Sequence, residues 1–149
     1  MAVAYLDMNG LKQINDRCGH DAGDHAIKTF FQTVVSSLGD RGEAYRLGSG
    51  GDEVLVVLPN SGFEAAIQFL KMSCTTLMSE RIENVDASLS IAAGVIICTD
   101  SSASPSDLRS AADQTQLRAK ERSKKDTPRP SVIAYGRDDL LVIPGKPGL

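Results

Sequence analysis

The amino-acid sequence predicts an α/β domain in which helices flank a mixed central sheet of five strands. Segments with strand periodicity alternate with segments of helical periodicity, and one pair of strands follows without a helix between them. The expected element order is β-α-α-β-β-α-β-α-β. At 149 residues, of which 42% are hydrophobic, the chain is long enough for one such domain with a sizeable core.

The individual elements follow from apolar spacing and from turn and cap residues. Strands are expected at residues 2–8, 43–47, 52–58, 87–99 and 131–135. Helices are expected at residues 11–17 and 25–38, from a cap at Ser61 to about Arg81, and from a cap at Ser104 to about Ser123. A glycine-bounded loop is expected at residues 19–24, with Asp24 as a candidate N-cap of the helix after it. We expect residues 1–136 to form the domain and residues 137–149 a C-terminal tail.

Charge and cysteine content exclude several classes of protein. A net charge of −3 gives no general attraction for DNA or for an anionic membrane surface. Three widely spaced cysteines indicate reduced, structural thiols rather than a disulfide framework or a zinc site. The first residues given show no basic stretch followed by an apolar signal core, and no apolar run reaches the roughly 20 residues of a membrane span. We therefore expect a soluble, cytoplasmic chain.

Acidic residues stand at two strand ends. Asp7 lies near the end of the first strand, and Asp52 and Glu53 follow the glycine-rich tip of the strand pair. These acids become neighbours if the two strands lie side by side. Hard carboxylates of this kind suit Mg²⁺ or Mn²⁺, which take their remaining ligands from phosphate oxygens and water. The pattern indicates a metal site for a nucleoside triphosphate, although a solvated hairpin tip is the simpler interpretation of the hairpin alone.

Three segments resemble the catalytic domain of GGDEF-type diguanylate cyclases. They are YLDMNGLKQINDRCGHDAGD at residues 5–24, the glycine-rich hairpin within residues 46–59, and the last long helix, where Ala112-Asp113 and Ala119-Lys120 keep the family spacing. The segments also occur in the order of the family. The resemblance covers roughly residues 3–135, and three motifs in order are more specific than the hairpin alone.

The resemblance implies an α+β, palm-like fold of the nucleotidyl-cyclase type. It implies that the chain binds GTP and, with Mg²⁺ or Mn²⁺, makes cyclic di-GMP and pyrophosphate. Two domains would meet antiparallel in a homodimer, so that each GTP 3′-hydroxyl attacks the α-phosphate of the other nucleotide. It also implies an upstream sensory or dimerising domain outside this chain.

Site residues are implied by matching positions in the family motifs. Asp7 and Asp52 would ligate the metals, with the Met8 carbonyl assisting and Glu53 acting as a ligand or as an aid to deprotonation. Two cations of this kind can lower the pKa of the attacking hydroxyl and offset the charge on the phosphoryl group.

The remaining implied residues bind the nucleotide. Asn15 and Asp24 would read the guanine edge, because a carboxylate can accept the N1–H and N2–H donors that adenine lacks in that pattern. The β- and γ-phosphates would be held by the amides of Gly10 and Leu11 and by two cations, Lys120 and Lys124. Lysines act on phosphates as point charges.

The sequence departs from the family pattern at several positions. Gly48-Ser49 is an apparent insertion, which we expect to lengthen the hairpin tip and to shift the acids after it. Asn9 stands where a second acid is common, and Gly10-Leu11 replace a common aromatic. Arg41 is followed three residues later by Ala44 rather than Asp, so we expect no product inhibition through the family's Arg-x-x-Asp site.

Two other functions stay open at this point. One is a different cyclic oligonucleotide synthase, because the palm of CRISPR-associated cyclases also pairs a strand-end Asp with a Gly-Gly-Asp hairpin. The other is a catalytically inactive, regulatory domain that binds GTP. The presence of every acidic residue of the expected site, together with Asn15, speaks against an inactive domain.

Overall fold

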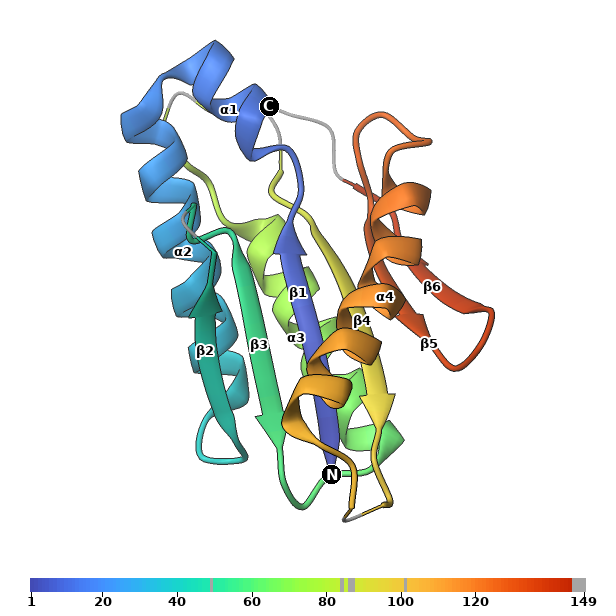
Figure 1. Cartoon of the computed structure of the whole chain (residues 1–149). Coiled ribbons are helices and arrows are strands. Elements are labelled where there is room, and N and C mark those ends of the chain that lie inside the picture. The colour runs from blue at the N-terminus through green and yellow to red at the C-terminus, as the bar shows by residue number, and fades with distance from the viewer. Residues whose placement is uncertain (49, 84, 86–87, 101, 146–149) are drawn as a thin grey trace.

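A six-stranded mixed sheet forms the centre of the molecule (Figure 1). The computed structural model describes residues 1–48, 50–83, 85, 88–100 and 102–145. The strand order across the sheet is β2-β3-β1-β4-β5-β6. Neighbouring strands pair antiparallel except β4 and β5, which are parallel. The mixed sheet flanked by helices agrees with the predicted fold class.

The elements follow one another in the order β1, α1, α2, β2, β3, α3, β4, α4, β5 and β6. The strands are β1 (Ala2–Met8), β2 (Glu43–Leu47), β3 (Glu53–Leu58), β4 (Ile91–Ile97), β5 (Ser131–Tyr135) and β6 (Asp139–Ile143). The helices are α1 (Leu11–Cys18), α2 (His20–Leu38), α3 (Phe63–Ser79) and α4 (Pro105–Ser123).

The central strand β1 is buried on both faces. On one face, Leu6 packs in the main core with Phe30 of α2 and Phe69 of α3. On the other face, Val3 and Tyr5 pack with Ala112 of α4. The sheet therefore lies between α4 on one side and α2 with α3 on the other (Figure 1).

Helix α4 approaches the sheet closely at Gly94 of β4. A Cβ atom on Gly94 would lie 2.2 Å from the backbone nitrogen of Gln116, so only glycine permits this distance. The close packing fixes α4 over β1 and β4. Ser104 caps the helix as predicted, because its hydroxyl accepts a hydrogen bond of 3.1 Å from the backbone nitrogen of Asp107.

Several predicted boundaries are wrong. A sixth strand, β6, lies in the segment expected to be a tail and pairs with β5 at the edge of the sheet. The predicted loop at 19–24 is helical, since α2 begins at His20, and Asp24 therefore lies inside this helix rather than at its cap. Helix α3 is preceded by Gly62 without a side-chain cap, so Ser61 does not cap it. Strand β4 is shorter than expected, and Ala87 lies outside the described residues.

None of the helices in the described part of the chain has both the length and the apolar character required to cross a membrane. Among the cysteines, Cys74 is buried in the core, and burial raises the pKa of its thiol to about 12. Cys74 is therefore an unreactive structural thiol, as expected.

Candidate nucleotide and metal site

Strands β1 and β3 bring the predicted acids together. Asp7 pairs directly with Glu53 across the antiparallel ladder, and the backbone nitrogen of Met8 donates to the carbonyl oxygen of Asp52 over 2.9 Å. Directly paired residues project from the same face, with Cβ atoms about 4.5–5.5 Å apart. The side-by-side strands expected from the sequence are therefore present, and the three acids meet at one end of the sheet.

The strands on either side of the hairpin tip are paired in regular register. Leu47 of β2 pairs with Glu53 of β3, and β3 keeps an unbroken register with β1. The extra length is therefore confined to the tip between these two residues. Of the insertion, Gly48 is described and Ser49 lies outside the described residues.

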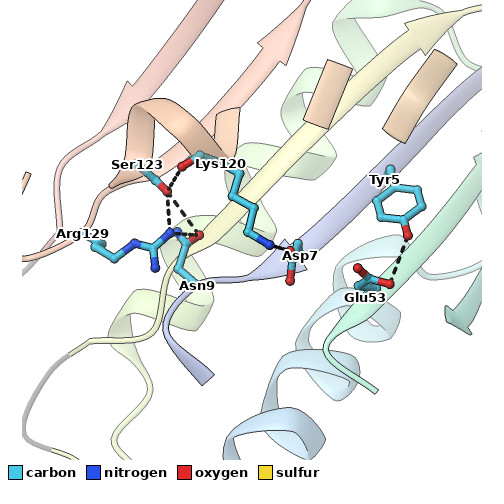
Figure 2. A network of polar contacts seen from close by, with 7 residues as sticks. All are labelled: Tyr5, Asp7, Asn9, Glu53, Lys120, Ser123 and Arg129. Atoms are coloured by element: carbon cyan, nitrogen blue, oxygen red, sulfur yellow. Dashed lines mark hydrogen bonds and ion pairs between the residues drawn. The ribbon is translucent and has the colours of Figure 1, made fainter. Parts of the chain in front are cut away.

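Asp7 forms an ion pair with Lys120 of α4. The Lys120 Nζ and Asp7 Oδ2 atoms are 2.9 Å apart, with side chains 40% and 6% exposed, respectively (Figure 2). Burial raises the pKa of Asp7 above its ordinary value, and the hydrogen bond and charge of Lys120 oppose that rise. The nearby charges of Asp52 and Glu53 raise the pKa further, so Lys120 is the charge that favours the ionised form of Asp7.

Glu53 is held by Tyr5, two residues before Asp7 on the same face of β1. The Tyr5 hydroxyl donates to Glu53 Oε2 over 3.1 Å. Burial and the charge of Glu53 raise the pKa of Tyr5 to about 12, so the phenol stays protonated and remains a donor. Tyr5 thereby orients the Glu53 carboxylate.

Asn9 joins the end of β1 to two distant segments (Figure 2). Its Nδ2 donates to Ser90 Oγ over 2.9 Å and to the Pro130 carbonyl oxygen over 3.2 Å. Its Oδ1 accepts from Ser123 Oγ over 3.3 Å and from Arg129 Nη2 over 3.1 Å. An amide can satisfy both donors and acceptors, whereas a carboxylate could only accept. This explains why asparagine suits the position where the family often has an acid.

The donor set at this end of the sheet is compatible with a Mg²⁺ or Mn²⁺ ion. The charges of Asp52 and Glu53 act on Asp7. The pKa of Lys120 is raised chiefly by its hydrogen bond to Asp7 and to a smaller extent by the charges of Glu53 and Asp52. Within the described residues, no three acidic, histidine or cysteine side chains form a preassembled metal cluster. Mg²⁺ commonly takes only one or two carboxylates and completes its shell with phosphate oxygens and water, so the carboxylates fit a metal that arrives with a nucleotide.

The expected base-reading residues lie on α1 and α2, away from the sheet. Asn15 is half-buried on α1, and Asp24 is exposed on α2. A Cβ atom on Gly23 would lie 1.7 Å from Asn15 Oδ1. Glycine at position 23 thus lets the Asn15 side chain lie against α2. The point of contact is one residue before Asp24.

The expected phosphate-binding groups are at the start of α1 and the end of α4. Gly10 is the N-cap of α1 and Leu11 its first residue, and no side chain caps this end. An uncapped helix N-terminus presents backbone N–H groups and a partial positive charge to an anion. Lys120 reaches Asp7, whereas Lys124 is exposed at the C-cap of α4 and forms no ion pair within the described part of the chain.

Sequence reasoning missed three residues of this network: Tyr5, Ser123 and Arg129. Tyr5 could have been found, because residues two apart in a strand share a face and Tyr5 precedes Asp7 by two. Ser123 and Arg129 meet Asn9 only through the tertiary fold, and no local pattern marks them. Arg41, at the start of the missing Arg-x-x-Asp motif, donates to the Leu38 carbonyl oxygen at the end of α2 over 3.2 Å.

Comparison with known proteins identifies related sequences. The family model described as "Diguanylate cyclase, GGDEF domain" matches residues 1–126. An uncharacterized protein of Mycobacterium tuberculosis is 37% identical over 125 residues, covering 80% of this chain and 19% of that protein. YhcK, an uncharacterized protein of Bacillus subtilis, is 28% identical over 123 residues, covering 80% of this chain and 34% of YhcK.

A shorter match is to the diguanylate cyclase DgcS of Shewanella oneidensis, which is 34% identical over 58 residues, covering 39% of this chain and 19% of DgcS. The chain therefore spans about a third or less of the length of these relatives.

Solved structures share the fold. The GGDEF domain of YfiN (TpbB) from Pseudomonas aeruginosa superposes with a TM-score of 0.77 at 24% identity, covering 93% of this chain and 83% of that domain. The active GGEEF domain of a diguanylate cyclase from Vibrio cholerae superposes with a TM-score of 0.74 at 21% identity, with the same coverage. At these identities the likeness establishes the fold.

Proposed function

The chain belongs to the GGDEF-domain diguanylate cyclase family, and on that premise we propose that it condenses two GTP molecules into cyclic di-GMP with release of pyrophosphate. The observation that carries the proposal is the pairing of Asp7 with Glu53, which places the strand-end acid beside the hairpin acids. The coupling of Lys120 to Asp7 adds a cation at the same point.

In the proposed site, Asp7 and Asp52 hold the metal together with the Met8 carbonyl. Bound Mg²⁺ or Mn²⁺ lowers the pKa of the attacking hydroxyl and offsets charge on the phosphoryl oxygens. Glu53, held by Tyr5, lies beside them as a further ligand or as an acceptor for the hydroxyl proton. Lys120, which pairs with Asp7 in the absence of nucleotide, would be available to the triphosphate at the same point.

At the other end of the nucleotide, Asp24 and Asn15 read the guanine base. A carboxylate accepts from both guanine N1–H and N2–H, and the asparagine amide adds a donor and an acceptor. Along the chain, the uncapped start of α1 at Gly10 and Leu11 lies between Asp7 and Asn15. It binds the β- and γ-phosphates together with Lys120 and Lys124.

One domain supplies one GTP, so turnover requires two copies facing each other. Holding the two nucleotides in line makes the attack of each 3′-hydroxyl effectively intramolecular. A homodimer, brought together by a partner or linked domain, is therefore part of the proposal. The reaction rate should rise with the square of chain concentration while the dimer is scarce.

The direct test is to incubate the concentrated chain with Mg²⁺ or Mn²⁺ and GTP, ATP or both, and to identify the products by mass spectrometry. We expect cyclic di-GMP and pyrophosphate from GTP. An adenine-containing cyclic product would instead indicate another palm-type oligonucleotide synthase. GTP binding without product at concentrations that give dimers would indicate a regulatory, catalytically inactive domain.

A further inference from the structure

A cavity of about 300 Å³ lies beside the proposed site, between α1 and the loop that joins α4 to β5. Its walls come from the turn between β1 and α1, from α1 itself, from residues 88–90 before β4, and from residues 127–129. This volume is at the lower end of the range for small-molecule sites. The cavity does not include Asn15 or Asp24 among its described lining residues, so it is separate from the expected base site.

The described residues of the cavity wall carry a positive charge. Arg17 of α1 and Arg129 both line it, and none of the described lining residues is acidic. Neither arginine takes part in the salt bridges of the described chain. The other polar groups on the wall include the amides of Asn9 and Gln13. Two arginines without a carboxylate partner point to an anionic ligand.

Arg129 is held in position by neutral hydrogen-bond partners and forms no salt bridge within the described structure. Its Nη2 donates to Asn9 Oδ1 over 3.1 Å and to Ser123 Oγ over 2.9 Å, both neutral acceptors. Its Nε is buried and has no hydrogen-bond partner within the described structure. Burial lowers the pKa of Arg129, and the charge of Asp7 opposes this shift without forming a salt bridge. A buried cation that has lost its hydration and has only neutral hydrogen-bond partners is stabilised when an anion binds beside it.

We infer that this cavity is an anion-binding pocket in which Arg17 and Arg129 hold a phosphate group of a small ligand. Guanidinium groups present parallel N–H donors that match phosphate oxygens. Gly10, which also lines the cavity, has no side chain to occupy it. The phosphate comes either from the end of the bound GTP triphosphate or from a second ligand. The first source rests on the proposed function, and the second does not.

The test uses inorganic pyrophosphate as the probe, with the full chain in EDTA so that no metal takes part. Affinity is measured by calorimetry at low ionic strength, and the arginine Nε–H resonances are followed by ¹⁵N NMR. We expect binding that shifts the Arg17 and Arg129 signals. Arg17→Met and Arg129→Met should each weaken binding at least about tenfold, the loss expected for one charge-assisted contact. Arg81→Met, at an exposed position after α3, is the matched control and should bind as the wild type does.

Two results would overturn the inference: no pyrophosphate binding by the wild type, or unchanged affinity in both arginine variants. Circular dichroism checks that each variant is folded. If Arg129→Met does not fold, Arg17→Met decides, because the Arg17 side chain is exposed and has no hydrogen bond or ion pair within the described structure. Arg129→Lys keeps the positive charge but loses the two parallel N–H donors of the guanidinium group. This variant should bind pyrophosphate less tightly than the wild type.

A second titration separates the two sources of phosphate. Saturation with a non-hydrolysable GTP analogue displaces pyrophosphate if the pocket holds the end of the triphosphate, and leaves it bound if the pocket serves a second ligand. Both results require the pocket. A chain that makes no cyclic dinucleotide but binds pyrophosphate through Arg17 contradicts the proposed function and keeps the pocket. If the wild type makes cyclic di-GMP and both arginine variants bind pyrophosphate as tightly as the wild type, the proposed function is kept and the pocket is contradicted.

Discussion

The two ends of the proposed nucleotide site are built in different ways. At the acid end, Asp7 is buried and tied to Lys120, and Asn9 next to it is tied to Ser123 and Arg129. These residues come from β1, α4 and the loop before β5, so the complete tertiary fold is needed to assemble them. At the base end, Asn15 and Asp24 come from two consecutive helices and are half-buried and exposed, respectively.

The difference separates chemistry from recognition. A buried, hydrogen-bonded acid end keeps charges in place for a reaction that depends on their positions. The base end makes fewer contacts, and its residues can adjust when a nucleotide arrives. Changes at the acid end should therefore reduce turnover strongly, whereas changes at the base end should act mainly on affinity and on the choice of base.

The largest effect is expected from Asp52→Asn. Loss of a metal ligand should lower turnover at least about a thousandfold, because the metal stabilises the transition state by several kcal/mol. The half-buried position predicts a change in free energy of unfolding within about 0.5 kcal/mol. Cyclic di-GMP formation and urea unfolding measure the two quantities. Asp138→Asn, in the exposed turn before β6, is the control that should leave both unchanged, and full turnover in Asp52→Asn would rule out its role as a ligand.

The next effect is expected from Lys120→Met. Lys120 opposes the rise in the pKa of Asp7, so its removal should let this pKa rise further. Protons should then compete with the metal for Asp7 at higher pH. Turnover should fall about ten- to a hundredfold, and the acidic limb of the kcat/KM profile should move to higher pH. Lys125→Met, exposed just beyond α4, should keep the wild-type profile. An unshifted acidic limb in Lys120→Met would show that the ion pair does not control Asp7.

A smaller effect is expected at the base end from Gly23→Ala. The new Cβ atom would displace the Asn15 side chain, so GTP affinity should fall about tenfold, the worth of a lost hydrogen bond to the base. Helical propensity should meanwhile raise the free energy of unfolding by up to about 1 kcal/mol. Calorimetry with a GTP analogue and thermal unfolding test both parts.

Asn15→Ala provides the partner for a double-mutant cycle with Gly23→Ala. If both changes act through Asn15, the double variant should lose little more affinity than either single variant. Independent, additive losses would mean that Gly23 does not act by accommodating Asn15.

The smallest effect is a pH-dependent change in stability at Asp7. The raised pKa in the folded state means that folding favours the protonated acid, so its contribution to stability is present at low pH. That contribution is lost as pH rises from the ordinary pKa of an aspartate through the raised folded value. Asp7→Asn cannot titrate and should lack this step. Subtracting its urea-unfolding curve from that of the wild type at each pH isolates the step, and a difference that does not vary with pH would contradict the burial of a charged Asp7.

The sequence was sufficient for five of the six strands and for the acid pair, because both leave local patterns. Apolar runs locate β1 and β3, and the acids at their ends predict the pairing that the register confirms. The start of α2 was missed because Gly23, read as part of a loop, lies in a helix where Asn15 packs against it. Strand β6 was missed because the prolines and glycines around it suggested a partly ordered tail.

The remaining site residues depend on contacts that a linear pattern does not encode. Arg129 lies in a proline-flanked loop, and only the parallel pairing of β5 with β4 brings that loop beside Asn9. Asn9 itself was recognised as a departure from the family, but its four hydrogen-bond partners come from segments more than 80 residues away. The cavity lined by Arg17 and Arg129 forms from the same long-range packing.

The metal at the acid end is the central claim, and nucleotide affinity with and without metal tests it most directly. Calorimetry with a non-hydrolysable GTP analogue needs neither turnover nor a dimer, so it isolates the site of one chain. We predict that Mn²⁺ strengthens nucleotide binding to the wild type and fails to do so in Asp7→Asn and Asp52→Asn. An equal gain from Mn²⁺ in all three proteins would contradict a metal site at these acids.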